Sequence, residues 1–143
     1  MGSITSANAV LTLSIPLLFP TPQQIQGFAP DDAWDFPTIK SVEVLMGVDG
    51  LLSAGFVFVP IIQSVTLQAD SLSTRVFDTW WTQMQATKNT YQANGLAIVP
   101  AISTKFQLVE GYLTGYKPAP AAKKLLQPRQ FEITWKGIGP API

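Results

Sequence analysis

The sequence predicts an all-β protein, a β-sandwich or partly open barrel with one flanking α-helix and long proline-rich loops. Several segments alternate apolar and polar residues with the period of two that a half-buried strand shows. A single segment spaces its apolar residues as a helix does, and two long proline-rich segments interrupt the regular ones. A chain of 143 residues is about one domain, so we expect a single domain over residues 1–143.

Alternation predicts three strands in the first half of the chain. The first covers residues 7–15 and ends at Pro16, and the second covers 39–46, with Val42, Val44 and Met46 on one face. A turn at 48–50 closes the second strand onto a third at 56–69, because glycine tolerates positive φ and aspartate can bond its own following backbone. In the third strand one set of residues should face a core: Ile61, Gln63, Val65, Leu67 and Ala69.

A helix is predicted directly after this strand. Residues 70–73 contain three side chains suited to capping free helix amide groups. Apolar residues then follow with helical spacing, at Val76, Phe77, Trp80, Trp81 and Met84. Trp80 and Trp81 are adjacent and cannot both point fully inward, so we expect one of them to cover a loop, a sheet rim or a neighbouring subunit.

The second half of the chain predicts three more strands, at residues 95–99, 105–114 and 130–136. The last is the clearest, because Phe131, Ile133 and Trp135 share one face. Residues 137–143 are rich in proline and glycine, and we expect them to form a mobile tail.

Two long segments resist regular structure. Residues 16–37 contain five prolines, which disfavour both a helix and a central strand. Loops of this length are usually functional or disordered, and their large apolar residues argue against disorder. We therefore interpret 16–37 as a docking loop. The second segment, 115–128, is extended and basic through Lys123 and Lys124, so it can reach an acidic neighbour.

Composition argues against catalysis. The chain has no histidine and no cysteine, which removes the commonest general base, the commonest metal ligand and every thiolate site. The acidic cluster Asp31, Asp32 and Asp35 lacks the glycine and distal glutamate of a calcium loop. We therefore predict that the protein is not an enzyme and uses no cofactor or metal.

Charge points instead to an assembly component. Nine basic and nine acidic residues cancel, so no strong field favours specific nucleic-acid binding. Only 13% of the residues are charged, against roughly 25% in an average soluble domain, and surfaces this poor in charge tend to be covered by partners. No apolar run reaches the length that spans a bilayer, so we expect no membrane contact.

A carbohydrate-binding β-sandwich is an alternative, because exposed tryptophan and tyrosine rings stack on sugars. Strand and helix spacing assigns Trp80 and Trp135 to a core, while Trp34 and Trp81 stay open to either role.

An ordered set of motifs over residues 39–136 resembles the small structural proteins that build the tail tube of tailed bacteriophages, including the Mu-like tube proteins. The set comprises the turn at 47–50, the strand at 63–67, the helix entry at 71–73 and the closing strand at 130–135. The resemblance implies a β-sandwich or barrel subunit that assembles into stacked, hexameric rings. The rings would form a hollow tube in the virion through which DNA passes, after assembly in the host cytoplasm.

The resemblance also implies roles for particular residues. Partners would be further copies of the chain and other tail proteins at the tube ends. The polar strand faces would line the lumen, through Ser64, Thr66, Gln68, Glu132 and Thr134. The docking loop would join rings through Phe19, Phe28, Trp34 and Phe36, and Trp81, Lys123 and Lys124 would face neighbouring subunits. A neck or baseplate adaptor ring of the same virion is the alternative that the sequence separates poorly from a tube.

Overall fold

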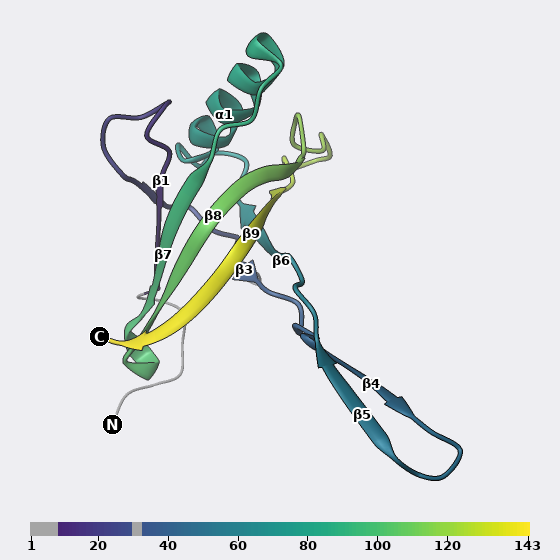
Figure 1. Ribbon diagram of the computed structural model, residues 1–143. Helices are drawn as coiled ribbons and strands as arrows, with labels where there is room; N and C mark the ends of the chain where they lie inside the picture. Colours follow the sequence, from purple (N-terminus) through teal and green to yellow (C-terminus); the bar gives the residue numbers. More distant parts are fainter. Residues whose placement is uncertain (1–8, 30–32) are drawn as a thin grey trace.

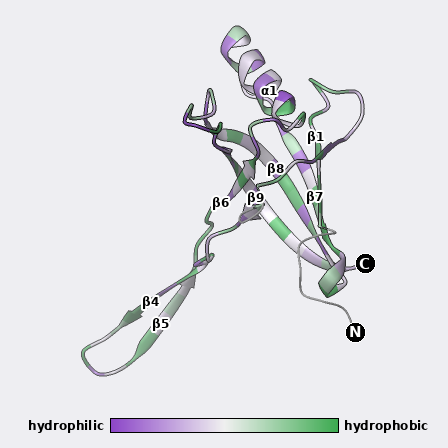
Figure 2. Ribbon diagram, turned by 180° about the vertical axis from the view of Figure 1, so that it is seen from behind, coloured by the Kyte–Doolittle hydropathy of each residue, from purple (hydrophilic) through white to green (hydrophobic). Residues whose placement is uncertain are grey.

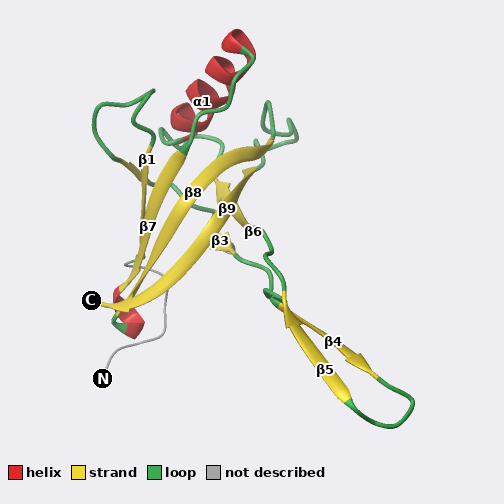
Figure 3. Cartoon of the chain, viewed as in Figure 1, coloured by secondary structure: helices red, strands yellow, loops and turns green. Residues whose placement is uncertain are grey.

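The computed structural model describes residues 9–29 and 33–143. Its main part is a seven-stranded, antiparallel, strongly curled sheet with the strand order β2-β1-β7-β8-β9-β6-β3. One α-helix lies at one end of this sheet, and a separate two-stranded hairpin projects from the opposite end (Figures 1 and 3). This architecture confirms the predicted all-β class with a flanking helix.

The elements follow one another closely along the chain. The helical elements are α1 (Thr74–Thr87) and a short 3-10 turn, η1 (Pro100–Ile102). The strands are β1 (Val10–Ser14), β2 (Gln23–Ile25), β3 (Trp34–Asp35), β4 (Val42–Met46), β5 (Leu52–Phe56), β6 (Ile61–Leu67), β7 (Ala93–Val99), β8 (Thr104–Tyr116) and β9 (Arg129–Pro142).

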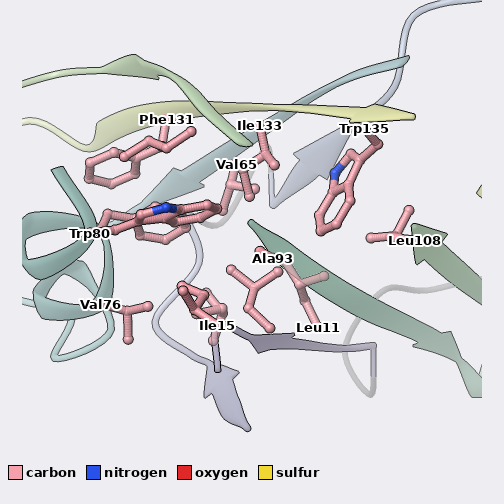
Figure 4. Packing of buried hydrophobic residues seen from close by; sticks show 14 of the residues in the cluster. Leu11, Ile15, Val65, Val76, Trp80, Ala93, Leu108, Phe131, Ile133 and Trp135 are labelled. Carbon is pink, nitrogen blue, oxygen red and sulfur yellow. The ribbon is translucent and has the colours of Figure 1, made fainter. Parts of the chain in front are cut away.

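The core lies between the inner face of the curled sheet and the helix (Figure 4). Strand β6 contributes alternate residues to it, and Ile61, Gln63, Val65 and Leu67 are all buried. The predicted inward face is therefore confirmed for these four residues, whereas Ala69, the fifth of the predicted set, lies beyond the end of β6 and is only partly buried. The predicted strand over 56–69 is nevertheless two elements, because β5 ends at Phe56 and β6 begins only after Pro60.

Helix α1 turns one side toward the sheet. Phe77 stacks on Phe131 with a centroid separation of 4.4 Å, and Trp80 is completely buried. Trp81 is only partly buried and stacks on Tyr116 at 4.8 Å. The prediction that the two tryptophans cannot both point inward is confirmed, and Trp81 covers the end of β8.

The serines before the helix do not cap it, contrary to the sequence prediction. The Ser73 side chain makes no capping bond; its hydroxyl instead accepts the backbone N–H of Gln26 at 2.8 Å. The Ser71 hydroxyl donates to the Gln26 carbonyl at 2.6 Å. These two bonds fasten residues 16–37 to the helix entry.

Residues 16–37 are therefore more regular than a free loop. They contain β2, which pairs with β1, and β3, which pairs with β6; Phe28 also forms an isolated bridge with Leu67. Five prolines did not prevent this, because short edge strands need few backbone donors. Asp31 and Asp32 of the predicted acidic cluster lie outside the described residues.

The sequence predicts a mobile tail over residues 137–143, but in the structure residues 137–142 continue β9 and pair with β8. The backbone N–H of Ile143 donates to the Ser103 carbonyl, so Ile143 and Ser103 form a hydrogen-bonded pair. In an antiparallel ladder, every second residue pair along the strands is hydrogen-bonded. By that alternation, Pro140 and Pro142 occupy positions whose N–H would point away from β8. The prolines therefore cost no hydrogen bond to β8, and they blunt the free edge of β9.

Candidate assembly surfaces

The hairpin formed by β4 and β5 is the most exposed part of the structure, and we call residues 41–59 the arm. Every residue of both strands is exposed. The turn between the strands is the predicted one: Gly50 has a φ of +87°, and the Asp49 carboxylate accepts the N–H of Leu51 at 3.1 Å. Val42, Val44 and Met46 share one face of β4, as predicted, but that face meets no core of this chain, because the arm extends away from the body (Figure 1).

Both strands of the arm carry apolar residues (Figure 2), and the strand register gathers most of them on one face. That face consists of Val42, Val44, Met46, Leu52, Ala54 and Phe56, whereas the other face carries Glu43, Leu45, Ser53 and Gly55. Leu45 is 75% exposed and Phe58 is 94% exposed. The other exposed large apolar residues of the arm are Val42, Val44, Met46, Val48, Leu51, Leu52, Phe56 and Val59. An isolated two-stranded hairpin is only marginally stable in water, and a contiguous apolar surface of this kind marks an interaction site. The arm is therefore the strongest candidate for a contact with another protein chain.

The five residues predicted to line a lumen lie close together on the outer face of the sheet. Ser64 on β6 is directly opposite Glu132 on β9, and Thr134 is opposite Ile62. Thr66 is on the same face, and Gln68 follows one residue after the end of β6. The Thr134 hydroxyl is 2.8 Å from that of Thr114 on β8. The structure thus forms one surface rich in hydroxyl groups from these residues, and their role in a lumen stays a prediction.

The aromatic residues predicted to dock on a neighbour lie partly against the chain's own core. Phe19, Phe28, Trp34 and Phe36 are all half-buried and pack at its margin. Phe28 and Trp34 meet edge to face with ring centroids 5.5 Å apart. Trp34 and Phe36 also line an apolar cavity of about 260 Å³ beside Ile39. Their interface role stays a prediction, with less free surface than the sequence suggested.

The second predicted contact segment begins at residue 117, since β8 extends to Tyr116. We call residues 117–128 the basic loop. Lys123 and Lys124 are exposed, as predicted for a segment that reaches a neighbour. Leu125 and Leu126 next to them are also exposed, so the loop combines positive charge with apolar surface.

A partly buried ion pair holds the base of this loop. The Arg129 guanidinium is 2.7 Å from the Asp78 carboxylate on α1 and donates to the Lys117 carbonyl at 2.9 Å. The Tyr116 hydroxyl also donates to Asp78. Burial raises the pKa of Asp78, but the hydrogen bonds from Arg129 and Tyr116 and the charge of Arg129 outweigh that effect, so the pKa lies below its usual value. The contact positions the loop relative to the helix.

Within residues 9–29 and 33–143, no group of three or more acidic side chains is placed to hold a metal ion. In the same part of the chain, no helix is both long and apolar enough to cross a membrane.

A model of the family described as tail fiber protein gp32 matches residues 2–139. Because the match covers almost the whole chain, the protein is a phage tail-associated structural protein. It belongs to the tail fiber protein gp32 family. The resemblance drawn from the sequence is thus confirmed at the level of phage tail proteins. The matching family, however, is described as a tail fiber protein and not as a tail tube protein. No curated protein matches the sequence.

Two solved structures share the fold over nearly their full length. A chain in the cryo-EM structure of the anti-feeding prophage (AFP) baseplate, 6-fold symmetrised, has a TM-score of 0.67 and 12% identity; the alignment covers 99% of this chain and 97% of that one. A chain in the extended sheath-tube complex of an extracellular contractile injection system, PVC, has a TM-score of 0.68 and 8% identity, with coverage of 99% and 93%. At these identities the likeness concerns the fold alone.

Proposed function

We propose that the protein is a ring-forming subunit of a tail tube, with stacked six-membered rings that leave a central passage for DNA. The observation that carries this proposal is the arm, whose large apolar residues are exposed and have no cover within the chain. In a closed ring, every copy can have its arm covered by a neighbouring copy, so no arm is left exposed. The fold shared with chains of a sheath-tube complex and of a 6-fold symmetrised baseplate supports the proposal.

The role we propose is mechanical, without catalysis or cofactor, and the location is the virion tail after assembly in the host cytoplasm. Other tail proteins would contact the ends of the assembly. The outer face with Ser64, Thr66, Gln68, Glu132 and Thr134 would line the passage. Hydroxyl and amide groups bind phosphate weakly and release few counterions, so DNA would slide along such a wall.

An adaptor ring at the neck or baseplate is the second candidate, and the shared fold with a baseplate chain favours it. We do not adopt the carbohydrate-binding alternative. Trp80 and Trp135 are completely buried, while Trp34 and Trp81 pack on other aromatic rings. This arrangement leaves no open tryptophan platform for a sugar among the described residues.

Negative-stain electron microscopy across a concentration series, with light scattering for mass, tests the proposal. Stacked rings with a central hole support a tube, and single rings that never stack support an adaptor. Thin rods without a hole would instead indicate a fiber. A monomer at every concentration would contradict self-assembly.

A further inference from the structure

We propose that the arm of one copy docks onto the basic loop of a second copy, with its tip against Lys123, Lys124, Leu125 and Leu126. This inference rests on the proposed function, because it names the contact that joins neighbouring subunits. Charge, apolar surface and the positions of the two segments carry it.

The two segments have opposite charge. The arm contains Glu43 and Asp49 and no basic residue, so its formal charge is −2. The basic loop contains Lys117, Lys123 and Lys124 and no acidic residue, so its formal charge is +3. In a chain with few charged residues and no net charge, this separation is a specific feature. Opposite patches of this kind steer association and fix register.

The apolar surfaces also correspond. Leu125 is 76% exposed and Leu126 is 59% exposed, which leaves two large side chains of the loop without cover. They border a cavity of about 600 Å³ that Asp70, Lys124 and Pro128 also line. A cavity of roughly 300–1,000 Å³ is of the size that holds a small ligand, so the apolar tip of a hairpin fits it. Asp70 is the one acidic group there, and Lys124 beside it offsets its charge.

The arm presents enough apolar area for its own side of a stable contact. The exposed apolar side chains of the arm together present on the order of 1,000 Å², while a standard interface buries about 800 Å² on each partner. The arm alone therefore offers enough surface for a specific complex between copies.

The positions of the two segments require the contact to be between chains. The arm and the basic loop extend from opposite ends of the molecule (Figures 1 and 2). One chain cannot bring its own arm tip to its own loop while the sheet stays intact. A contact from arm to loop is therefore heterologous, and its repetition gives a closed ring or an open helical array.

A charge exchange tests this contact. The arm variant combines E43K with D49N, which keeps a side-chain oxygen to accept the turn hydrogen bond; the loop variant combines K123E with K124E. Each alone should raise the concentration needed for assembly about tenfold or more, because like charges then face each other. A mixture of the two variants should assemble as the wild type does, since every arm then has a complementary loop in an alternating array. If the mixture fails to assemble although the wild type forms rings, the contact is wrong and the proposed function stands.

Cysteine cross-linking provides an independent test, because the natural chain contains no cysteine. The double variant V48C/K124C should give a ladder of covalent multimers on a non-reducing gel, since a disulfide needs Cα atoms within about 7 Å. The matched control is V48C/L17C, in which Leu17 is 78% exposed on the loop after β1; it should give no ladder beyond dimers. Ladders of equal strength from the two double variants would overturn the inference. So would the absence of a ladder from V48C/K124C when microscopy shows that this variant forms rings. Absence of both rings and ladder would overturn the proposed function as well.

Discussion

The same substitution at two leucines should have opposite effects on folding and assembly. Leu67 on β6 is completely buried, whereas Leu45 on the arm is 75% exposed. Leu67→Asp removes about 1.5–3 kcal/mol of apolar burial. It also places an unpaired carboxylate in the core, which costs several kcal/mol more. The sum approaches the whole stability of a domain, about 5–15 kcal/mol, so we expect no soluble folded protein.

Leu45→Asp should leave the domain folded, because exposed substitutions usually change the free energy of unfolding by about 0.5 kcal/mol or less. Its effect should fall on assembly. If a neighbour covers the exposed three quarters of this side chain, the contact loses roughly 1–2 kcal/mol, which weakens it by about tenfold.

Circular dichroism and urea denaturation measure whether each variant is folded and how stable it is. Sedimentation velocity across a concentration series measures its assembly. A well-folded Leu67→Asp protein would refute the assignment of the inner face. Unchanged assembly of Leu45→Asp would refute the assignment of the arm as an interface.

Three further predictions follow from the packing. Gly111→Ala should destabilise the domain by about 1–3 kcal/mol in urea denaturation, because a Cβ there would overlap the buried indole ring of Trp135. The control Gly137→Ala has open space around it and should be close to neutral. Equal effects of the two substitutions would contradict this packing. Trp34→Ala should leave the domain folded but slow or abolish polymerisation, and assemblies of normal length and yield by electron microscopy would show that its ring has no interface role. The pKa of Asp78 is lowered in the folded state, so its contribution to stability is complete above the unfolded value of 3.8 and is lost as pH falls below it. Thermal melts from pH 7 to 3 should therefore show a smaller loss for Asp78→Asn than for the wild type, and parallel curves would argue against this ion pair.

Where burial follows a local period, the sequence predicted the structure well. Residues 61–67 alternate cleanly, and their buried set is the predicted one. Helix α1 carries its apolar residues at helical spacing, and Val76, Phe77 and Trp80 are buried as expected. In both segments one face meets the core, so the pattern of side chains directly reports the environment.

The arm was missed for the converse reason. Most large residues of its two strands are apolar although all are exposed, so the rule that apolar residues lie inside does not locate them. A signal was present, because apolar runs flank the predicted turn at residues 48–50 on both sides. That symmetry is typical of a hairpin. Whether a hairpin joins the sheet or leaves it depends on tertiary contacts, which no local pattern contains.

Proline content alone gives a poor prediction for the tail and the long loop, because the effect of a proline depends on its position in the strand ladder. Pro140 and Pro142 fit β9 because their missing N–H groups would point away from β8. Residues 16–37 are held by Ser71 and Ser73, nearly fifty positions further along the chain. Serine next to a helix predicts a cap, and only the folded arrangement shows that these hydroxyls bond to Gln26 instead.

Native mass spectrometry of the purified protein tests the central claim most directly, because it counts the copies in each assembly. The proposed ring predicts a dominant species of six subunits, each of 15.5 kDa, which is lost when the arm is replaced by a short glycine-serine turn. A single 15.5 kDa species at every concentration, or six-subunit rings that persist without the arm, would contradict the account.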